Sequence, residues 1–319
     1  MFYKIKHADI FQGNLKKKNY FEGWYYKFLD KQQNHALAII VGISLNKIDP
    51  HAFIQVFKYK ESHEPSLTTF YFRYDIKCFK FDKKLFEITI KNNTFSNNHI
   101  TLHLKSDALT LDGTLNISNA TPIKSTLYKP NIMGPFAYIP NMECNHAVVS
   151  MLSDVSGILQ YQDIHLDFNQ TQAYIEKDWG RSFPSKYVWL QSNHFKQKDT
   201  SFMFSYATIP FMGLKFNGLI SNLYVFNQQF IFSTYNFSRI KKKIINPNDV
   251  YFKIKKHRYT LEIKAIQEHV VPLVSPYEGK MDHQIKEGLS GTISIKLYKK
   301  KKLIFEDTGL FSGIEIMFI

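Results

Sequence analysis

The sequence predicts an almost all-β chain that forms two antiparallel β-barrels packed in tandem, with few short helices. Apolar and polar residues alternate over many short segments, which is the period of a half-buried strand, and turn-forming residues bound each segment. Aromatic residues make up 16% of the chain and suit both strands and ring-lined cavities for apolar ligands. No segment shows a long helical period, and many closely spaced strands are typical of a sandwich or a barrel.

The 319 residues favour two domains, and a hydrophobic content of 44% suffices for a core in each. We expect one barrel over residues 1–160 and a second over residues 161–319. A stretch with four prolines at residues 119–145 is interpreted as a connector or a functional loop. Strands are expected in the first half at His35–Leu45, His51–Tyr59, Thr68–Asp75, Leu85–Lys91, Ile100–Leu104 and Leu109–Ile117. They are expected in the second half at Ala147–Leu152, Gly157–Gln162, Thr171–Glu176, Tyr187–Gln191, Ser201–Thr208, Leu214–Phe226, Phe230–Phe237, Val250–Gln267, Gly291–Tyr298 and Leu303–Phe305.

The net charge of +14 has two interpretations: an anionic partner, or lysine as a general surface residue. Only four of the 41 basic residues are arginines, whereas nucleic-acid readers use arginine for bidentate and stacking contacts. We therefore favour the surface interpretation and expect no nucleic-acid partner. Transient contact with an anionic membrane surface that supplies a lipid stays open as a weaker alternative.

The compartment is expected to be the cytoplasm, with a membrane-peripheral location as the alternative. The two cysteines, Cys78 and Cys144, show neither zinc spacing nor a disulfide framework. The first residues, Met1–Gly13, are charged and lack the apolar run of a signal peptide. No stretch approaches the length of a membrane-spanning helix. The oligomeric state is left open.

Rare residue types cluster in three segments that are candidates for chemistry. The first, Tyr20–Lys27, places Glu22 among five aromatic rings. The second lies within Gly134–His146, and the third, Tyr174–Trp189, is rich in carboxylates and aromatic rings. The charged form of a carboxyl group among apolar rings is disfavoured, so such a group can act as an acid at neutral pH. Nearby aromatic faces can stabilise a cation, so these segments suit protonation of an alkene.

A simpler interpretation of the same segments stays open. The three carboxylates Glu22, Glu176 and Asp178 can also be turn or salt-bridge residues, and the tryptophans can be core residues.

The order of residues in these segments resembles the tocopherol cyclase family. The resemblance rests on FEGWYYK at 21–27, PNMECNHAVVSM at 140–151 and YIEKDWGRSFPSKYVWLQSNHF at 174–195, with PYEGKM at 276–281 and Gly291–Ile293 further on. It implies two lipocalin-like β-barrels with a cavity for a hydrophobic ligand, similar to carotenoid hydratases. It also implies an isomerase that closes the chromanol ring of a prenylated hydroquinone without a metal or redox cofactor. Plant members carry a transit peptide; because the first segment here begins by Tyr20, we expect a bacterial-type member.

Such a cyclase must protonate an alkene in the prenyl tail and let the phenol oxygen attack the resulting cation. We expect Asp178 and Glu176 to be the first candidates for the proton donor and Glu22 to be the next. On a regular strand Glu176 and Asp178 share one face while Lys177 points to the other.

The substrate-binding residues are expected to be Trp24, Tyr25, Glu143, Asn145, His146, Trp179, Arg181 and Trp189. Among them, Trp24 and Trp179 would shield the cation, while Asn145, His146 and Arg181 would orient or deprotonate the phenol. Arg181 can alternatively pair with Glu143 or Asp178 to neutralise a buried charge.

No metal and no cofactor are expected. His99 and His103 share one strand face, but no third ligand accompanies them. Cys144 lies two residues before His146 and is interpreted as a packing residue rather than a nucleophile. A second functional hypothesis is a non-catalytic protein whose barrels bind a hydrophobic isoprenoid or fatty ligand. An enzyme needs a carboxyl group at the cavity wall, whereas a carrier needs only an apolar cavity.

Overall fold

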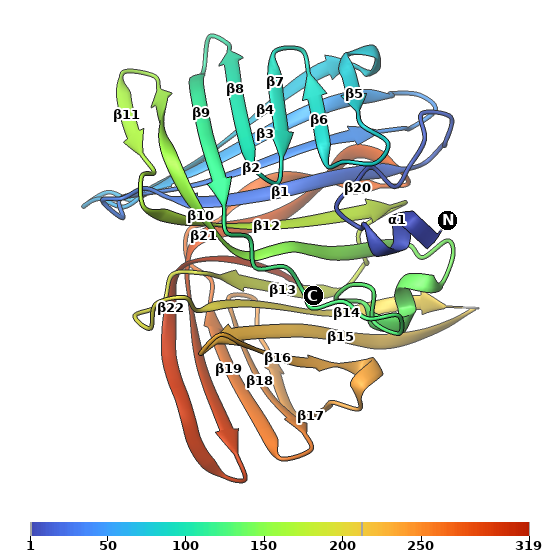
Figure 1. Cartoon of the computed structure of the whole chain (residues 1–319), viewed down its shortest axis with the longest axis vertical. Helices are drawn as coiled ribbons and strands as arrows, with labels where there is room; N and C mark the ends of the chain where they lie inside the picture. The colour runs from blue at the N-terminus through green and yellow to red at the C-terminus, as the bar shows by residue number, and fades with distance from the viewer. Residues whose placement is uncertain (1, 212, 319) are drawn as a thin grey trace. The chain divides into compact units, whose positions relative to one another are not determined.

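The computed structural model describes residues 2–211 and 213–318 of the chain, and strands dominate it (Figure 1). The helical elements within these residues are short: α1 (Phe2–Lys6) and the 3-10 helices η1 (Ile76–Cys78), η2 (Gly134–Tyr138) and η3 (Thr234–Asn236). The predicted all-β class with few short helices is therefore confirmed.

The chain divides into two compact units. The first comprises the chain up to Phe183 together with Val274–Gln284, and the second comprises Pro184–Leu273 and the residues from Ile285 onward. The structure places the division after Phe183 rather than after residue 160. The reason is that residues 164–167 and 171–180 still form strands of the first sheet.

The first unit is built on an antiparallel sheet of twelve strands in the order β4-β3-β2-β1-β12-β10-β9-β8-β7-β6-β5, with β11 paired to β10. The latest strand in sequence, β12, therefore lies between β1 and β10. The strands are β1 (Phe21–Leu29), β2 (His35–Ser44), β3 (His51–Lys60), β4 (Ser66–Asp75), β5 (Phe79–Phe81), β6 (Glu87–Ile90), β7 (Asn93–Ser96), β8 (His99–Lys105), β9 (Thr110–Ser118), β10 (Cys144–Tyr161), β11 (Ile164–Asp167) and β12 (Thr171–Gly180).

The second unit is built on a ten-stranded sheet in the order β16-β15-β14-β13-β22-β21-β19-β18-β17, with β20 paired to β21. The tip of the β20–β21 hairpin is the part of this sheet that belongs to the first unit. The strands are β13 (Tyr187–Ser192), β14 (Ser201–Phe211), β15 (Leu214–Val225), β16 (Gln228–Ser233), β17 (Arg239–Ile245), β18 (Asp249–Lys256), β19 (Tyr259–Ile266), β20 (Val271–Tyr277), β21 (Lys280–Lys299) and β22 (Lys302–Met317).

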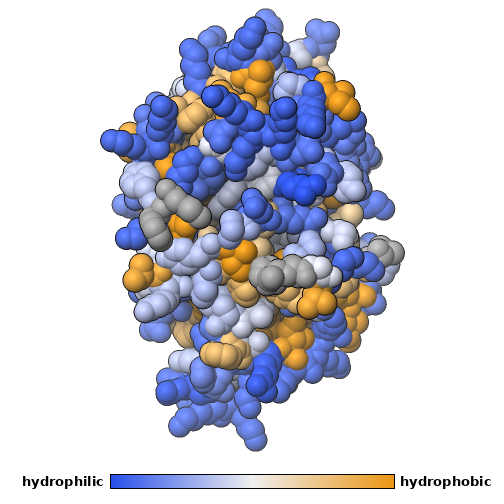
Figure 2. Space-filling view, turned by 90° about the vertical axis from the view of Figure 1, so that its right-hand side faces the viewer, coloured by the Kyte–Doolittle hydropathy of each residue, from blue (hydrophilic) through white to orange (hydrophobic). Residues whose placement is uncertain are grey.

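The face of the molecule shown in Figure 2 is mainly hydrophilic. Hydrophobic residues form smaller groups on it. Large apolar side chains that are well exposed, such as Ile48 and Phe237, lie far apart in the sequence. Among the residues that the structure describes, no helix is both long enough and apolar enough to cross a membrane.

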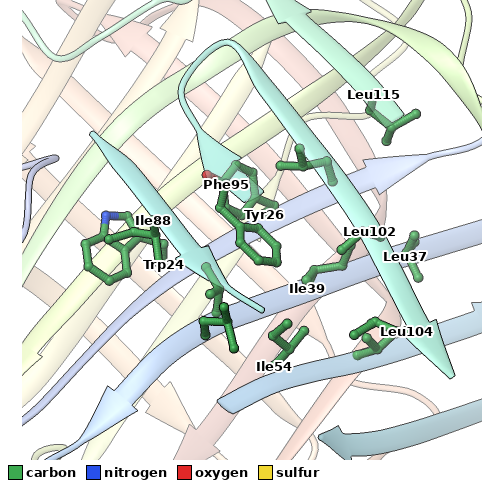
Figure 3. Packing of buried hydrophobic residues seen from close by; sticks show 14 of the residues in the cluster. Trp24, Tyr26, Leu37, Ile39, Ile54, Ile88, Phe95, Leu102, Leu104 and Leu115 are labelled. Atoms are coloured by element: carbon green, nitrogen blue, oxygen red, sulfur yellow. The ribbon is translucent and has the colours of Figure 1, made fainter. Parts of the chain in front are cut away.

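The core of the first unit explains the curvature of its sheet. Trp24 and Tyr26 of β1 are fully buried and pack in one cluster with residues of β6 to β9, such as Phe95 and Leu102 (Figure 3). These strands are distant in the strand order, so the sheet folds back on itself around a single core. We call the face that bears Trp24 and Tyr26 the core face, and the opposite face of the same strands the outer face. The second unit has its own cluster, which includes Phe204 and Phe252.

Several strand predictions need correction. The two predicted strands at Ala147–Leu152 and Gly157–Gln162 are parts of one strand, β10, and the predicted strand at Phe230–Phe237 ends at Ser233, just before η3 begins. The segment that forms β1 is a strand that the sequence pattern does not predict. β1 is almost entirely buried on both faces, so its residues do not alternate between apolar and polar. The predicted strand at Val250–Gln267 is two strands, since His257 has a φ of +47° and begins the turn between β18 and β19. The predicted irregular stretch at residues 119–145 is confirmed up to residue 143, where β10 is about to begin.

Candidate functional site

The centre of the first sheet brings the three predicted segments together. β12 pairs with β1 on one side and with β10 on the other, so that Asp178 lies opposite both Gly23 and His146. Residues directly opposite one another on antiparallel strands share a face. Asp178, His146 and the next residue but one on β12, Glu176, therefore lie on the outer face. Lys177 lies on the core face, as the strand period predicts.

On the outer face an imidazole lies between two carboxylates. His146 Nδ1 is 2.9 Å from Asp178 Oδ1, and its Nε2 is 3.5 Å from Glu176 Oε2. Tyr174, two residues earlier on β12, donates a hydrogen bond of 2.6 Å from its hydroxyl to Glu176 Oε2. The Asp178 side chain is 24% exposed and that of Glu176 is 5% exposed, so Asp178 is the carboxylate that solvent or a ligand can reach more readily. We call these four residues the outer-face cluster.

Burial favours the neutral forms of Tyr174, within the cluster, and of Cys144, beside it. Burial raises the pKa of the Tyr174 hydroxyl well above its usual value, and the nearby Glu176 raises it further. Burial likewise raises the pKa of the Cys144 thiol, and Asp178, whose Oδ1 is 3.8 Å from Cys144 Sγ, adds to this effect. Because the thiolate is the nucleophilic form, Cys144 is poorly suited to nucleophilic catalysis.

The same cluster contains the ligand atoms that could hold a metal ion. His146, Glu176 and Asp178 each offer one such atom, and these atoms lie within 4.8 Å of one another. One imidazole with two carboxylates is a donor set that divalent first-row metals accept. His99 and His103, considered from their spacing, have other contacts: His99 Nδ1 lies 3.0 Å from Ser96 Oγ, and His103 forms an exposed pair with Asp112.

Glu22, the third predicted acid, lies on the core face, apart from Asp178 and Glu176. Its side chain is fully buried, and its Oε1 is 2.6 Å from Lys177 Nζ. The two carboxylate oxygens also accept hydrogen bonds from the backbone amides of Gln12 (2.7 Å) and Gly13 (2.9 Å) and from the hydroxyl of Tyr20 (2.5 Å). These four donors place Glu22 in an internal ion pair that ties the N-terminal segment to the sheet.

The two tryptophans expected to shield a cation flank the ammonium group of Lys177. Lys177 Nζ lies 4.5 Å from the ring centroid of Trp24 and 4.9 Å from that of Trp179. It also donates hydrogen bonds to the carbonyls of Ala8 (2.9 Å) and Ile10. Burial lowers the pKa of Lys177 to about 8, against the opposing effect of Glu22. These rings therefore surround a lysine on the core face, not the outer-face cluster.

The remaining predicted residues are distributed over several places. Tyr25 is buried on the outer face and lies opposite Glu176. Asn145 lies opposite Trp179, to whose carbonyl its amide donates a hydrogen bond of 3.4 Å. Trp189 lies in β13, which belongs to the second unit.

Arg181 pairs with neither of the acids considered for it. Its guanidinium forms an exposed ion pair with Glu278, at 2.5 Å, whereas Glu143 accepts a hydrogen bond from the Arg181 backbone amide through its carbonyl. This contact explains part of the PYEGKM segment. Gly279 has a φ of +72°, and a Cβ atom there would lie 2.2 Å from the Tyr20 backbone nitrogen, so only glycine fits.

Sequence reasoning did not single out two residues that the structure brings to this place. Tyr174 has a signal, since the spacing Tyr174–Glu176–Asp178 puts all three on one strand face. Gly23 has no such signal, because its position opposite Asp178 depends on the pairing of β1 with β12.

Solved structures with the same fold cover most of the chain. A protein assigned as AttH from Nitrosomonas europaea has 10% sequence identity and a TM-score of 0.53, over 94% of this chain and 93% of that one. Kievitone hydratase from Nectria haematococca has 11% identity and a TM-score of 0.54, over 93% and 89%. CghA with Sch210972 has 6% identity and a TM-score of 0.59, over 94% and 88%. At these identities the likeness shows the fold, a lipocalin-like β architecture.

Sequence comparison gives the family. A search of curated proteins returned no match. The profile of the family described as tocopherol cyclase-like matches residues 124–317, well over half of the chain. The matched range includes β10 and β12, the strands that bear His146, Glu176 and Asp178. The chain therefore belongs to the tocopherol cyclase-like family.

Proposed function

We propose that the chain is an isomerase that closes a chromanol-type ring on a prenylated hydroquinone or a related prenyl lipid. The family supports a role in lipid modification of the isomerase or hydratase type, and one structural neighbour is a hydratase. The observation on which the proposal rests is the position of His146 between the carboxylates of Asp178 and Glu176. This arrangement offers a proton donor and a proton acceptor within one cluster.

The reaction needs no oxidant or reductant, because substrate and product have the same composition. Asp178, protonated, donates its proton to one carbon of the tail alkene, and the alkene electron pair forms the new C–H bond. The adjacent carbon becomes a tertiary cation. The phenol oxygen attacks this cation and forms the new C–O bond, and the phenol proton then leaves to the cluster. The proton lent at the first step is thereby restored, so the cluster ends in its starting state.

The cluster suits this exchange because His146, Glu176 and Asp178 each offer an atom within 4.8 Å of those of the other two. An imidazole between two carboxylates can pass a proton from one ring nitrogen while it receives one at the other. The hydroxyl of Tyr174 fixes Glu176, and Glu176 in turn orients His146. We assign the return of the proton to His146.

Asp178 is the better candidate for the donor of the two outer-face acids. Glu176 is 5% exposed and already accepts the hydrogen bond from Tyr174, so its carboxylate is occupied within the sheet. Asp178 is 24% exposed and lies opposite Gly23, which presents no side chain. A reacting alkene carbon can approach Asp178 more closely than Glu176.

The test is conversion of a prenylated quinol by the full-length protein. The purified chain is incubated with a methylphytyl-benzoquinol without added cofactor, and the chromanol is detected by a chromatographic shift at constant mass. Asp178→Asn should lower kcat by about two to four orders of magnitude while the thermal unfolding midpoint stays unchanged. His146→Gln should also lower kcat, because the proton then has no return path.

The matched control is Asp112→Asn. Asp112 forms a similar carboxylate–imidazole pair with His103, at 2.6 Å, but that pair is about half exposed and lies on β8 and β9. The control should keep wild-type activity. Normal turnover in Asp178→Asn would show that Asp178 is not the acid. Tight binding of the quinol without product in the wild-type protein would support the carrier function instead.

A further inference from the structure

Gly23 is a glycine that the backbone does not require. It lies within β1, where glycine weakens a strand and usually marks a bulge, a close backbone approach or a bound ligand. Its φ lies outside the left-handed region, so any residue could adopt its conformation. The pairing of β1 with β2 and with β12 runs without a register shift, which excludes a bulge at this position.

Space does not require this glycine either. A Cβ atom at Gly23 would lie 3.5 Å from Ile40 Cγ2, 3.7 Å from the Val41 carbonyl oxygen and 4.0 Å from Phe53 Cζ. These are ordinary van der Waals distances, and Gly23 is only partly buried. No backbone or side-chain atom among the described residues therefore occupies the place that a Cβ atom at Gly23 would take.

The neighbouring glycine shows the contrast. Gly42 lies opposite Gly23 on β2, and a Cβ atom at Gly42 would lie 2.6 Å both from the Glu22 carbonyl oxygen and from Phe53 Cζ. Gly42 is thus needed for the packing of the Phe53 ring, which lies across it from β3. That ring also stacks on Tyr71, with a centroid distance of 5.4 Å. The Phe53 ring therefore covers Gly42, whereas the place that a Cβ atom at Gly23 would take is open.

The open place at Gly23 has chemically different borders. Asp178 lies opposite Gly23 on one side, with His146 beyond it on β10. The Phe53 ring, which lies over Gly42, borders it on the other side. A flat, apolar ring system placed on Gly23 would meet an aromatic ring at one edge and the proton-transferring groups at the other.

We infer that Gly23 is a specificity-determining residue that supports the forming chromanol ring system beside Asp178. This inference rests on the proposed function. The glycine keeps the floor of the site flat, so that the alkene and the phenol of the substrate lie at the level of the Asp178 carboxyl group. Any side chain at this position lifts the ring system away from the acid.

The test is a graded pair of variants, Gly23→Ala and Gly23→Val, in the full-length protein. Because the added Cβ meets no close atom, neither the folded fraction nor the thermal midpoint should fall in Gly23→Ala. Its kcat/KM for the methylphytyl-benzoquinol should fall by about tenfold or more, since displacement by about an ångström costs that much in an aligned reaction. Gly23→Val should fall further. Equilibrium binding of the same quinol should weaken in parallel.

The matched control is Gly218→Ala. Gly218 lies in β15 and also has a φ outside the left-handed region. A Cβ atom there would come close only to the flexible end of Ile209, at 2.6 Å, and would lie at an ordinary 3.7 Å from the Phe216 ring. This variant should leave both turnover and binding unchanged. Wild-type turnover and binding in Gly23→Ala would overturn the inference and leave the proposed reaction intact.

Other outcomes separate the two proposals. If the wild-type protein binds the quinol without turnover and Gly23→Ala binds it less tightly, the reaction fails and Gly23 stands as a ligand-contacting residue. If the wild-type protein neither binds nor converts the quinol, the reaction and the assignment of Gly23 both fail.

Discussion

Replacement of Lys177 by methionine probes the buried ion pair of the first unit. Methionine keeps much of the length of the lysine stem but removes the ammonium group, which lies 2.6 Å from Glu22 Oε1 and between two tryptophan rings. Glu22 would then keep three donors around a fully buried carboxylate. The carbonyls of Ala8 and Ile10 would lose their donor as well.

The expected cost follows from this burial. Removal of one partner of a buried pair leaves an uncompensated charge and lowers the free energy of unfolding by about 3–5 kcal/mol. The matched control is Lys253→Met, since Lys253 pairs with Glu262 at 2.8 Å on the surface and is 44% exposed. An exposed pair contributes at most about 1 kcal/mol, so this control should change stability little.

The assay is urea denaturation of the full chain, followed by tryptophan fluorescence. Trp24 and Trp179 lie within 4.9 Å of the Lys177 ammonium, so their signal reports on the pair itself. The double variant Lys177→Met/Glu22→Gln should be less destabilised than the sum of the single variants by about 1 kcal/mol or more, because no unpaired charge is left. A loss below about 1 kcal/mol in Lys177→Met, or strict additivity in the double variant, would refute the reasoning.

Three further predictions concern the same sheet. Burial lowers the pKa of Lys177 from 10.5 to about 8, so the folded state releases this proton at a lower pH than the unfolded state does. The stability of the wild type relative to Lys177→Met should therefore rise as the pH increases from about 8 to 10.5. Paired urea titrations of the two proteins measure this difference. Gly42→Ala should lower the free energy of unfolding by about 1–3 kcal/mol, because the new methyl group overlaps the Phe53 ring, whereas a thermal scan of Gly23→Ala shows no loss. Tyr174→Phe removes the donor to Glu176 and should cost about 1–3 kcal/mol in the same denaturation assay; an unchanged midpoint would show that this hydrogen bond contributes nothing.

The all-β class could be predicted because apolar and polar residues alternate along the sequence of a half-buried strand. β1 could not be predicted in this way, because it is buried on both faces and its residues do not alternate. The position of the division between the two units could not be predicted either. β12 looks from sequence like a strand of the second half, yet it pairs with β1 and β10 of the first.

The candidate site was predictable in part. The shared face of Glu176 and Asp178 follows from their spacing alone, whereas the contact of Asp178 with His146 depends on the register of two strands. The sequence shows aromatic residues around Glu22, but the ion-pair partner of Glu22, Lys177, comes from a distant part of the sequence. Local sequence cannot show on which face of a sheet such a partner lies. The position of the partner decides whether a carboxyl group forms an internal ion pair or can act as an acid.

β12 and the tip of the β20–β21 hairpin are translated after the strands of the first unit that they contact, and this order has a consequence for synthesis on the ribosome. β1 to β10 emerge first, but the edges of β1 and β10 that β12 joins stay unpaired until Gly180 has been made. The contacts of Gly279 with Ser44 and Arg181 come later still, after most of the second sheet has been translated. Unpaired strand edges invite wrong partners, so the nascent chain passes through a prolonged aggregation-prone stage in which chaperones can act. The first unit is therefore the first to begin translation, but its fold is completed only after β12 and the hairpin tip have been made.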